Sequence, residues 1–559
     1  MDSKPWLKSY DEGVPHTLEP YPDKTIVDIL DDIVQERPDH PALLFSGTQI
    51  SYLQLARLSD AFAAALVALG VKKGDRLALL LPNCPQFLIA QLGGFKAGAI
   101  VAPINPLYTE RELEHALLEC GAEAVIVLSS FYEKVKAVQS RTKLRTVVAT
   151  NIKEYLPGHL RFLFTLLKEK SGGHRVSLTD GDMWMGDLLA EHAGAGRPQI
   201  SVTPQDPAIL LFTGGTTGSP KGAVGSHQAL VVTPMQVYTW FKDILEEWDD
   251  VLLLPIPLFH VYANVGALGA AIIGRMPVAL IPNPRDLDDL IANIRKIRPA
   301  FMPGVPTLFI ALLNHPDVQA GKVDFKSVKL CISAAAPLLY ETKQRFEALT
   351  GGKLVEAYGL TESMLAAVFT PVFGEYKAGG VGLPLPDVEL RIADVDTGEG
   401  SLSTGEAGEI LLRGRQIMTG YWEHPTETAN TIRDGWLHTG DIGYLDEDGY
   451  LFIVDRMKDL IKPSGFQVWP REVEEVIAQH PAVAEVGVAG VSDERQGEAV
   501  KAWIVLREGE SVTVDELRDY CRQELVPYKV PRFVEFRDSL PKSMVGKVLR
   551  RELVTSEGE

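Results

Sequence analysis

The sequence predicts an α/β fold in which a large N-terminal domain, residues 1–455, precedes a small α+β C-terminal domain, residues 456–559. Short apolar runs alternate with helix-length segments as far as Val368, which favours wound, mostly parallel sheets covered by helices. Residues 388–391 and 408–413 then alternate apolar and polar positions between glycine-rich turns, which predicts a small antiparallel β subdomain. Separate helix and strand patterns after Asp455 predict the second domain.

The expected elements follow one another in a regular order. Tyr52–Leu69 is apolar at helical spacing and ends at Gly70, and the apolar run 76–81 before Pro82 is typical of a buried strand. Next come a helix at 85–97, a strand at 100–104, a helix at 110–118, a strand at 124–128, and a second series of the same kind at 208–368. In the C-terminal domain we expect helices at 471–479 and 514–524 and strands at 483–488 and 500–505.

Composition limits the classes of protein that fit. Of the 559 residues, 46% are hydrophobic and 23% charged, which is ordinary globular usage. The net charge of −19 argues against a dedicated nucleic-acid binder. Four widely spaced cysteines exclude a disulfide framework and a cysteine zinc cluster. With no secretory signal pattern and no apolar run of spanning length, we expect a cytoplasmic protein.

The strongest local signal is the segment 209–222, ILLFTGGTTGSPKG. An apolar strand leads into three glycines, three threonines and Lys221, a combination that brings backbone N–H groups, hydroxyls and a positive charge to an anion. A flexible surface loop is the alternative interpretation. The segment lacks the GKS or GKT ending of a Walker A loop.

Four further motifs follow in order: EAYGLTE at 356–362, WLHTGD at 436–441, DRMKDLIKPSG at 455–465 and PKSMVGK at 541–547. Each alone is typical of a polar turn. Together with the glycine-rich segment they resemble the adenylate-forming superfamily of acyl-CoA synthetases, luciferases and peptide-synthetase adenylation domains, from about residue 25 to about residue 553. The segments NPLYTERELEH at 105–115 and DGWLHTGDIG at 434–443 are most similar to bacterial long-chain fatty-acid–CoA ligases.

The resemblance implies a nucleotide site. The β- and γ-phosphates of ATP would be held by Thr213, Gly214, Gly215, Thr216, Thr217, Gly218 and Lys221. Mg²⁺ would lie on Glu362 and Thr213, and Thr361 would contact the α-phosphate. Adenine would lie against Ala335, Glu356, Ala357, Tyr358 and Gly359, and the ribose against Asp441 and Arg456. The loop at Ala335 (SAAAP, 333–337) departs from related sequences, which often carry more glycine there.

The resemblance also implies the acyl and CoA sites. His260 and Tyr262 would wall the carboxylate end of the acyl pocket, and Lys462, Ser464 and Gly465 would accommodate CoA. Lys547 would contact the carboxylate and the α-phosphate, and Lys458 would be the hinge of a rotating C-terminal domain.

The predicted function is therefore ATP- and Mg²⁺-dependent ligation of a long-chain fatty acid to coenzyme A through an acyl-adenylate, with release of AMP and pyrophosphate. The same chemistry on a medium-chain or aryl acid, or with a carrier-protein acceptor, is the alternative enzyme. A catalytically silent sensor is a second alternative, against which Lys547, Glu362 and Asp441 argue. The apolar stretch 301–312 is a candidate wall of the acyl tunnel.

Residues 153–170, KEYLPGHLRFLFTLLKEK, combine an apolar stripe with basic residues. Leu156, Leu160, Leu163, Phe164 and Leu167 fall at helical spacing beside Arg161, Lys168 and Lys170, and Pro157 limits the helix to the later part. One interpretation is peripheral contact of 156–170 with the inner face of the membrane. The other is packing on its own domain or on a second subunit of a homodimer.

Overall fold

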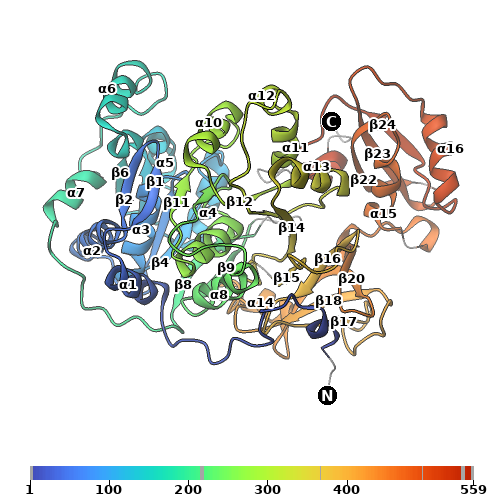
Figure 1. Ribbon diagram of the computed structural model, residues 1–559, viewed down its shortest axis with the longest axis horizontal. Helices are drawn as coiled ribbons and strands as arrows, with labels where there is room; N and C mark the ends of the chain where they lie inside the picture. The colour runs from blue at the N-terminus through green and yellow to red at the C-terminus, as the bar shows by residue number, and fades with distance from the viewer. Residues whose placement is uncertain are drawn as a thin grey trace.

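The computed structural model describes residues 4–213, 220–365, 367–466, 468–493, 495–542 and 548–555, and these form three β-sheets (Figure 1). The first sheet is parallel except for its last strand, which returns antiparallel beside β8. Its strands, in spatial order, are β7 (Met183–Trp184), β6 (Thr146–Thr150), β5 (Ala124–Leu128), β3 (Arg76–Leu80), β4 (Ile100–Pro103), β8 (Pro207–Phe212) and β9 (Gly222–Ser226).

The second sheet is a long path whose two halves differ in strand direction. The half from β10 to β14 is parallel, and from β14 onward the neighbouring strands run antiparallel. In spatial order the strands are β17 (Glu389–Ala393), β18 (Gly408–Arg413), β20 (Trp436–Leu445), β21 (Leu451–Arg456), β16 (Gly380–Pro384), β15 (Val368–Phe369), β14 (Lys353–Tyr358), β13 (Leu330–Ser333), β12 (Phe301–Gly304), β10 (Leu252–Leu254), β11 (Val278–Leu280), β1 (Pro41–Phe45) and β2 (Thr48–Ser51), with β19 (Ile432–Arg433) beside β20. The predicted antiparallel subdomain therefore continues the parallel sheet through hydrogen bonds.

Helices and sheets alternate in layers around three hydrophobic cores. One core lies between the first sheet and the helices α4 and α5, a second lies between the two sheets and includes α2, α3 and α8, and a third joins β10–β14 to α10, α11 and α13. The helices are α1 (Ile26–Glu36), α2 (Tyr52–Ala68), α3 (Pro85–Lys96), α4 (Glu110–Cys120), α5 (Tyr132–Gln139), α6 (Gly158–Leu167), α7 (Met185–Glu191), α8 (Ala229–Phe241), α9 (Gly269–Ile273), α10 (Leu287–Ile297), α11 (Pro306–Asn314), α12 (Pro316–Gln319), α13 (Tyr340–Thr350) and α14 (Pro425–Thr431). The predicted α/β class is confirmed.

The residues after Arg456 form a separate lobe with its own core (Figure 1). Its sheet pairs β22 (Val483–Asp493) antiparallel with β23 (Gly497–Leu506) and β23 parallel with β24 (Phe533–Phe536). The helices are α15 (Pro470–Ala478), α16 (Val514–Glu524) and α17 (Arg550–Thr555). Arg550 of α17 forms ion pairs with Asp455 at 2.9 Å and Asp459 at 2.9 Å, which ties the lobe to the end of β21.

Local sequence explains where several helices begin. Thr25, Ser51, Thr109 and Thr513 each cap a helix, and the residue three positions later returns a hydrogen bond to the cap. This reciprocal pair satisfies two backbone N–H groups that a helix start leaves free. The predicted helices at 52–69 and 514–524 are therefore observed within one residue of their expected bounds.

Within the described residues, no helix is both long enough and apolar enough to cross a lipid bilayer.

Candidate active site

A cluster of polar side chains lies where β14, β20 and β21 meet. Asp441 on β20 stands directly opposite Arg456 on β21, so the pairing of the two strands itself brings the opposite charges together. Arg456 Nε lies 3.0 Å from Asp441 Oδ1, and the hydroxyl of Tyr358, the last residue of β14, donates to Asp441 Oδ2 at 2.8 Å. Asp441 is 4% exposed, and each of its carboxylate oxygens has one of these two protein partners.

Burial and charge set the protonation of this cluster. Burial, reinforced by Asp441, raises the pKa of Tyr358 well above its usual value, so the phenol stays neutral and donates. Burial alone would lower the pKa of Arg456, but the Asp441 carboxylate and Tyr358 raise it, so the guanidinium stays charged. The three predicted nucleotide residues thus form one hydrogen-bonded unit.

Lys458 lies beside this unit in the short 3-10 turn η5 (Met457–Asp459), which connects β21 to the C-terminal lobe. Burial and then the charge of Arg456 lower the pKa of Lys458, while Asp459, Asp441 and Glu362 oppose that shift. The turn that leads into the lobe is therefore electrostatically coupled to Asp441 and Glu362.

Glu362 is joined to Lys221 through an aromatic residue that the motifs did not indicate. The hydroxyl of Tyr421 donates to Glu362 Oε1 at 2.8 Å, and Lys221 Nζ lies 5.5 Å from the centre of the Tyr421 ring. Tyr421 reaches this position because its backbone pairs with Ala223 of β9, the strand that begins directly after Lys221. Its sequence signal is weak, a single tyrosine after Gly420, and the spatial neighbourhood depends on that long-range pairing.

The ends of the glycine-rich segment are fixed on the sheet. Thr213 follows β8 and Lys221 precedes β9; the Thr213 N–H donates to the Lys221 carbonyl at 2.9 Å. The strand expected before the loop is confirmed. Gly214, Gly215, Thr216, Thr217 and Gly218 lie outside the described residues, as does Lys547.

The residues expected around adenine lie at the ends of β13 and β14. Glu356 is buried; Tyr376 Oη donates to its Oε1 at 3.2 Å, and burial raises its pKa. Ala357 and Gly359 flank Tyr358 on the same strand end. Ala335 has φ +73°, a left-handed conformation that glycine adopts without strain and that is uncommon for a residue with a side chain.

His260 and Tyr262 lie at the start of η4 (Tyr262–Leu268), a π-helical turn that precedes α9. The Tyr262 hydroxyl donates to the carbonyl of Ile332 at 2.8 Å, at the end of β13, so its hydrogen is used by the backbone. Burial lowers the pKa of His260 to about 4, so the imidazole is neutral near pH 7. A neutral ring at this place is compatible with a carboxylic acid or an uncharged acyl group.

An apolar cavity opens along the same turn. Asn264, Val265 and Leu268 of η4 line it, together with side chains from α1, α2, α3, α9, β1 and β11 that include Leu30, Leu43, Leu55 and Phe95. Asn264 and Gln91 exchange two hydrogen bonds of 3.0 and 2.8 Å across the wall, so these two amides are satisfied without a ligand. The remaining lining is mostly hydrocarbon.

The stretch 301–312, expected as a tunnel wall, contributes no residue to the lining of this cavity, and its contact with the acyl chain stays a prediction. Phe309 and Leu312 of α11 are fully buried in the core between β10–β14 and α10, α11 and α13. The cavity wall instead comes from segments that are far apart in the sequence.

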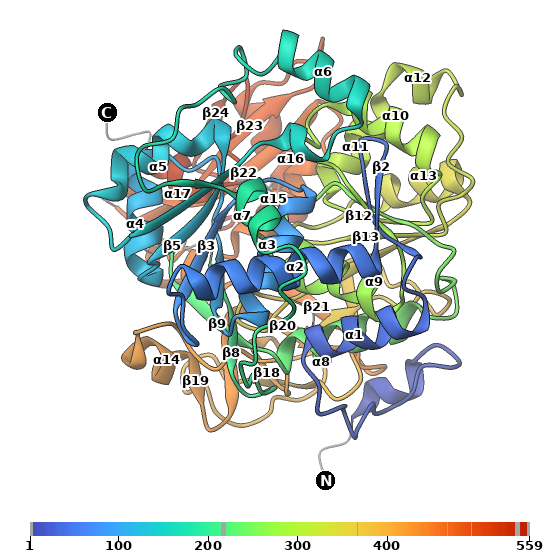
Figure 2. The ribbon, with the colours of Figure 1, turned by 90° about the vertical axis from the view of Figure 1, so that its left-hand side faces the viewer.

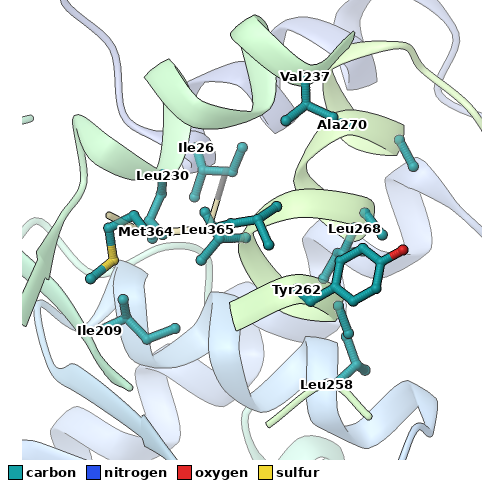
Figure 3. Close-up of a cluster of buried hydrophobic side chains, with 14 of the residues drawn as sticks. Ile26, Ile209, Leu230, Val237, Leu258, Tyr262, Leu268, Ala270, Met364 and Leu365 are labelled. Carbon is teal, nitrogen blue, oxygen red and sulfur yellow. The ribbon is translucent and has the colours of Figure 1, made fainter. Parts of the chain in front are cut away.

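The turn after Glu362 presses on η4 (Figure 3). Met364 and Leu365 have φ +49° and +100°, and such angles are strained for residues with a side chain. A side chain on Gly266 of η4 would collide with Leu365, so glycine is required for this contact. The turn carrying Thr361 and Glu362 is thereby packed directly on the helix that lines the cavity.

The residues expected at CoA lie within the C-terminal lobe and are held by its β-sheet region. The Lys462 N–H donates to Glu498 Oε2 at 2.7 Å, and the Ser464 N–H donates to the Gln496 carbonyl at 2.8 Å. Ser464 has φ +51° and stands next to Gly465 in the turn η6 (Pro463–Gly465). In this arrangement the two side chains are exposed.

The site offers oxygen ligands suited to Mg²⁺. Among the residues that the structure describes, no group of three or more His, Cys, Asp and Glu side chains could hold a metal ion. Glu362, which uses Oε1 to accept from Tyr421, and Thr213 are the candidate ligands. Since Mg²⁺ is commonly held by one or two carboxylates with phosphates and water, this sparse set fits a metal that arrives with a nucleotide.

Comparison with known proteins identifies the family. Residues 30–422 match the family model described as AMP-binding enzyme, and residues 472–547 match the family model described as AMP-binding enzyme C-terminal domain. The chain is 39% identical to the long-chain-fatty-acid–CoA ligase of Bacillus subtilis (strain 168), with 100% of this chain and 99% of that protein covered. It is similar to ATP-bound MatB of Rhodopseudomonas palustris (TM-score 0.82, 28% identity, 95% and 99% covered) and to the anthranilate CoA ligase AuaEII in complex with anthranoyl-AMP (0.83, 26%, 96% and 98%).

The family model spans residues 30–422, which is most of the chain, and the Bacillus subtilis relative is aligned over the whole length. The chain therefore belongs to the AMP-binding enzymes of the adenylate-forming superfamily, and within it to the acyl-CoA ligases.

Proposed function

We propose that the chain ligates a long-chain fatty acid to coenzyme A, with ATP and CoA as co-substrates. The observation that carries the substrate class is the apolar cavity along η4, because the turn that begins with Tyr262 continues into the cavity wall at Val265 and Leu268. A fatty acid with its carboxylate at His260 and its chain along η4 would bury its methylenes there. The names of relatives support the same class, and the anthranilate-binding neighbour keeps an aryl acid as the alternative.

The first step would be attack of the carboxylate oxygen on the α-phosphorus of ATP, with pyrophosphate as the leaving group. Two anions must approach each other, so preorganised positive charge is required. Lys221, Lys547 and a Mg²⁺ on Glu362 and Thr213 would supply it, and the metal would neutralise phosphate charge when bound. Asp441, held between Tyr358 and Arg456, would accept hydrogen bonds from the ribose.

The second step would be attack of the CoA thiol on the acyl-adenylate carbonyl, with AMP as the leaving group. Lys547 and the segment from Lys462 to Gly465 would serve different steps, so we propose two domains, 1–455 and 456–559, that rotate about Lys458. The position of Lys458 in a three-residue turn between β21 and the C-terminal lobe supports this role. Lys458→Pro should preserve pyrophosphate release and greatly reduce thioester formation, because proline restricts φ to about −65°.

The substrate class is tested by thioester formation with ATP, Mg²⁺ and CoA across acids from acetate to oleate, with benzoate included. Each methylene that enters the cavity contributes up to about 0.8 kcal/mol, so kcat/KM should rise with chain length until the cavity is full. A maximum at acetate or benzoate would overturn the assignment and leave adenylation of another acid. A maximum of kcat/KM at medium chain length would mean that the same reaction acts on a medium-chain acid.

The catalytic role of Lys547 is tested by assaying the two half-reactions separately. Lys547→Ala should lower ATP–pyrophosphate exchange by about 10²–10³, because one preorganised charge is lost from the transition state. Thioester formation from presynthesised acyl-adenylate and CoA should be largely intact. Undiminished exchange in the folded variant would remove Lys547 from the mechanism.

A further inference from the structure

We propose that α6 docks on a lipid surface that carries anionic headgroups. The helix stands out from the rim of the N-terminal domain beyond β6, and it projects in both views (Figures 1 and 2). It belongs to an excursion between β6 and β7 that begins with η3 (Ile152–Tyr155) and returns at His174.

None of the ten residues of α6 is buried, although six of them are large and apolar. Phe162, Leu163, Leu166 and Leu167 are 65%, 47%, 64% and 69% exposed. The pairs 162/166 and 163/167 are each four residues apart, so the four side chains share one face of the helix. The most exposed stripe thus includes Phe162 and Leu166 in addition to the positions that periodicity indicated.

The base of the excursion is firmly held, in contrast to its apolar tip. The Lys153 ammonium lies 2.5 Å from Glu169 Oε1, and Asn151 Nδ2 donates to Glu169 and to the carbonyl of His174. Ser129 Oγ lies 3.0 Å from His174 Nδ1. A ten-residue helix is marginal in water without an apolar partner. A segment whose polar base is fixed by hydrogen bonds and whose apolar helix face has no protein partner is typical of an element that lies at a membrane interface.

The charges around α6 are mainly positive, although the whole chain carries −19. Arg161, Lys168, Lys170 and Arg175 are exposed within or just after the helix. Two carboxylates lie near this end of the helix: Glu169, which is paired with Lys153, and Asp289 on α10, whose pKa is raised by burial while the charge of Lys168 opposes that rise. Basic residues beside an apolar face complement anionic headgroups. Anionic lipids would therefore repel this region less than they repel the rest of the acidic protein surface.

A lipid surface fits this face better than a second copy of the chain. A ten-residue helix is about 15 Å long, whereas a stable protein interface takes roughly 20–30 residues from each partner. The choice also rests on the proposed function, because long-chain acids partition into bilayers. A side chain at Gly47, in the turn between β1 and β2, would lie 3.6 Å from Pro157 Cγ, so the start of α6 touches the strand pair that supplies Leu43 to the cavity.

The test is flotation of the full-length protein with vesicles, without acid, ATP or CoA. Phosphatidylcholine vesicles with roughly one third phosphatidylglycerol should bind the protein, and pure phosphatidylcholine should bind it much less. The double variant Phe162→Ser/Leu166→Ser should reduce binding to the anionic vesicles at least about tenfold. The matched control is Leu107→Ser/Phe373→Ser, which removes two side chains of 50% and 60% exposure elsewhere and should bind as the wild type does.

A second variant, Lys168→Glu/Lys170→Glu, should reduce anionic binding about fivefold per residue while its apolar face is intact. Equal binding of wild type and both α6 variants would overturn the proposal. So would a dimer in sedimentation analysis that Phe162→Ser/Leu166→Ser converts to monomer, since the face would then be a subunit interface. Ligase activity of the α6 variants on a short acid without vesicles should match the wild type, so a failed proposed function is recognised separately.

Discussion

The two sides of the candidate active site treat charge in opposite ways. On the nucleotide side, opposite charges are kept and paired, as in the contact of Asp441 with Arg456. On the acyl side, titratable groups are held neutral: burial lowers the pKa of His260 to about 4, and it does the same for His227, which packs against Phe95 of the cavity wall.

The physical reason for the difference is the ligand that each side would take. Fixed charges stabilise a polyanion at little reorganisation cost, whereas an unpaired charge next to a hydrocarbon tail would be desolvated without compensation. The two sides should therefore fail separately. Substitutions among the paired charges should change the use of ATP and keep the order of preferred acids, and substitutions in the cavity should do the reverse.

The largest effect is expected for Asp441→Asn. The variant loses the partner of a mostly buried guanidinium and an acceptor for the ribose, so kcat/KM for ATP should fall about 10²–10³-fold, the equivalent of roughly 3–4 kcal/mol. Steady-state kinetics with ATP varied, repeated with several acids, measures this. Asp448→Asn, which removes the charge of a half-exposed partner of Lys8 and Lys377 after β20, is the control and should be near wild type. A changed order of acids in Asp441→Asn would show that the two sides are coupled.

Val265→Phe tests the cavity side. The larger ring would occupy part of the space along η4, so the preference for a long over a medium acid should fall by about 10²-fold, the value of roughly four methylenes. KM for ATP should be unchanged. Ile310→Phe on α11 is the matched control from the stretch that the sequence suggested as a tunnel wall. If Ile310→Phe shortens the preferred acid and Val265→Phe does not, the acyl chain lies along the stretch 301–312 and not in the cavity along η4.

Glu362→Gln should have a smaller effect, about tenfold at limiting Mg²⁺, because a neutral amide is a poorer ligand than a carboxylate. The amide oxygen can still accept from Tyr421, so the packing of the turn is kept. Added Mg²⁺ should restore part of the rate. A wild-type rate at limiting Mg²⁺ would exclude Glu362 as the ligand.

The sequence predicts the paired-charge side far better than the cavity. The motifs contain the three residues of this side, Tyr358, Asp441 and Arg456. Each of them lies on a strand or at its end, and the apolar pattern of each strand can be recognised from neighbouring residues alone. Tyr421 depends on pairing with Ala223, almost two hundred positions away, and no local pattern encodes it. The cavity draws on seven or more elements, and periodicity marks a residue such as Leu55 or Phe95 as apolar without saying which core it lines.

The same limit applies to local geometry. The residues around Tyr262 carry no local signal that distinguishes a π-helical turn from an α-helix. The strained turn at Leu365 follows from packing against Gly266, which becomes visible only when both segments are in place.

The smallest effect on activity is expected for a substitution at His227. Its consequence should appear instead in how the free energy of unfolding depends on pH. His227 is buried with a pKa of about 4, against about 6.5 in an unfolded chain. Between these values the unfolded chain binds a proton that the folded chain does not, so stability is complete above about pH 6.5 and falls as the pH drops towards 4. One such histidine contributes a slope of up to about 1.4 kcal/mol per pH unit. Urea unfolding from pH 7 to pH 4 should show this slope reduced in His227→Gln, with activity at pH 7 within about twofold of wild type. An unchanged slope would mean that His227 is protonated in the folded protein, and the view that the acyl side holds its titratable groups neutral would then be wrong at this residue.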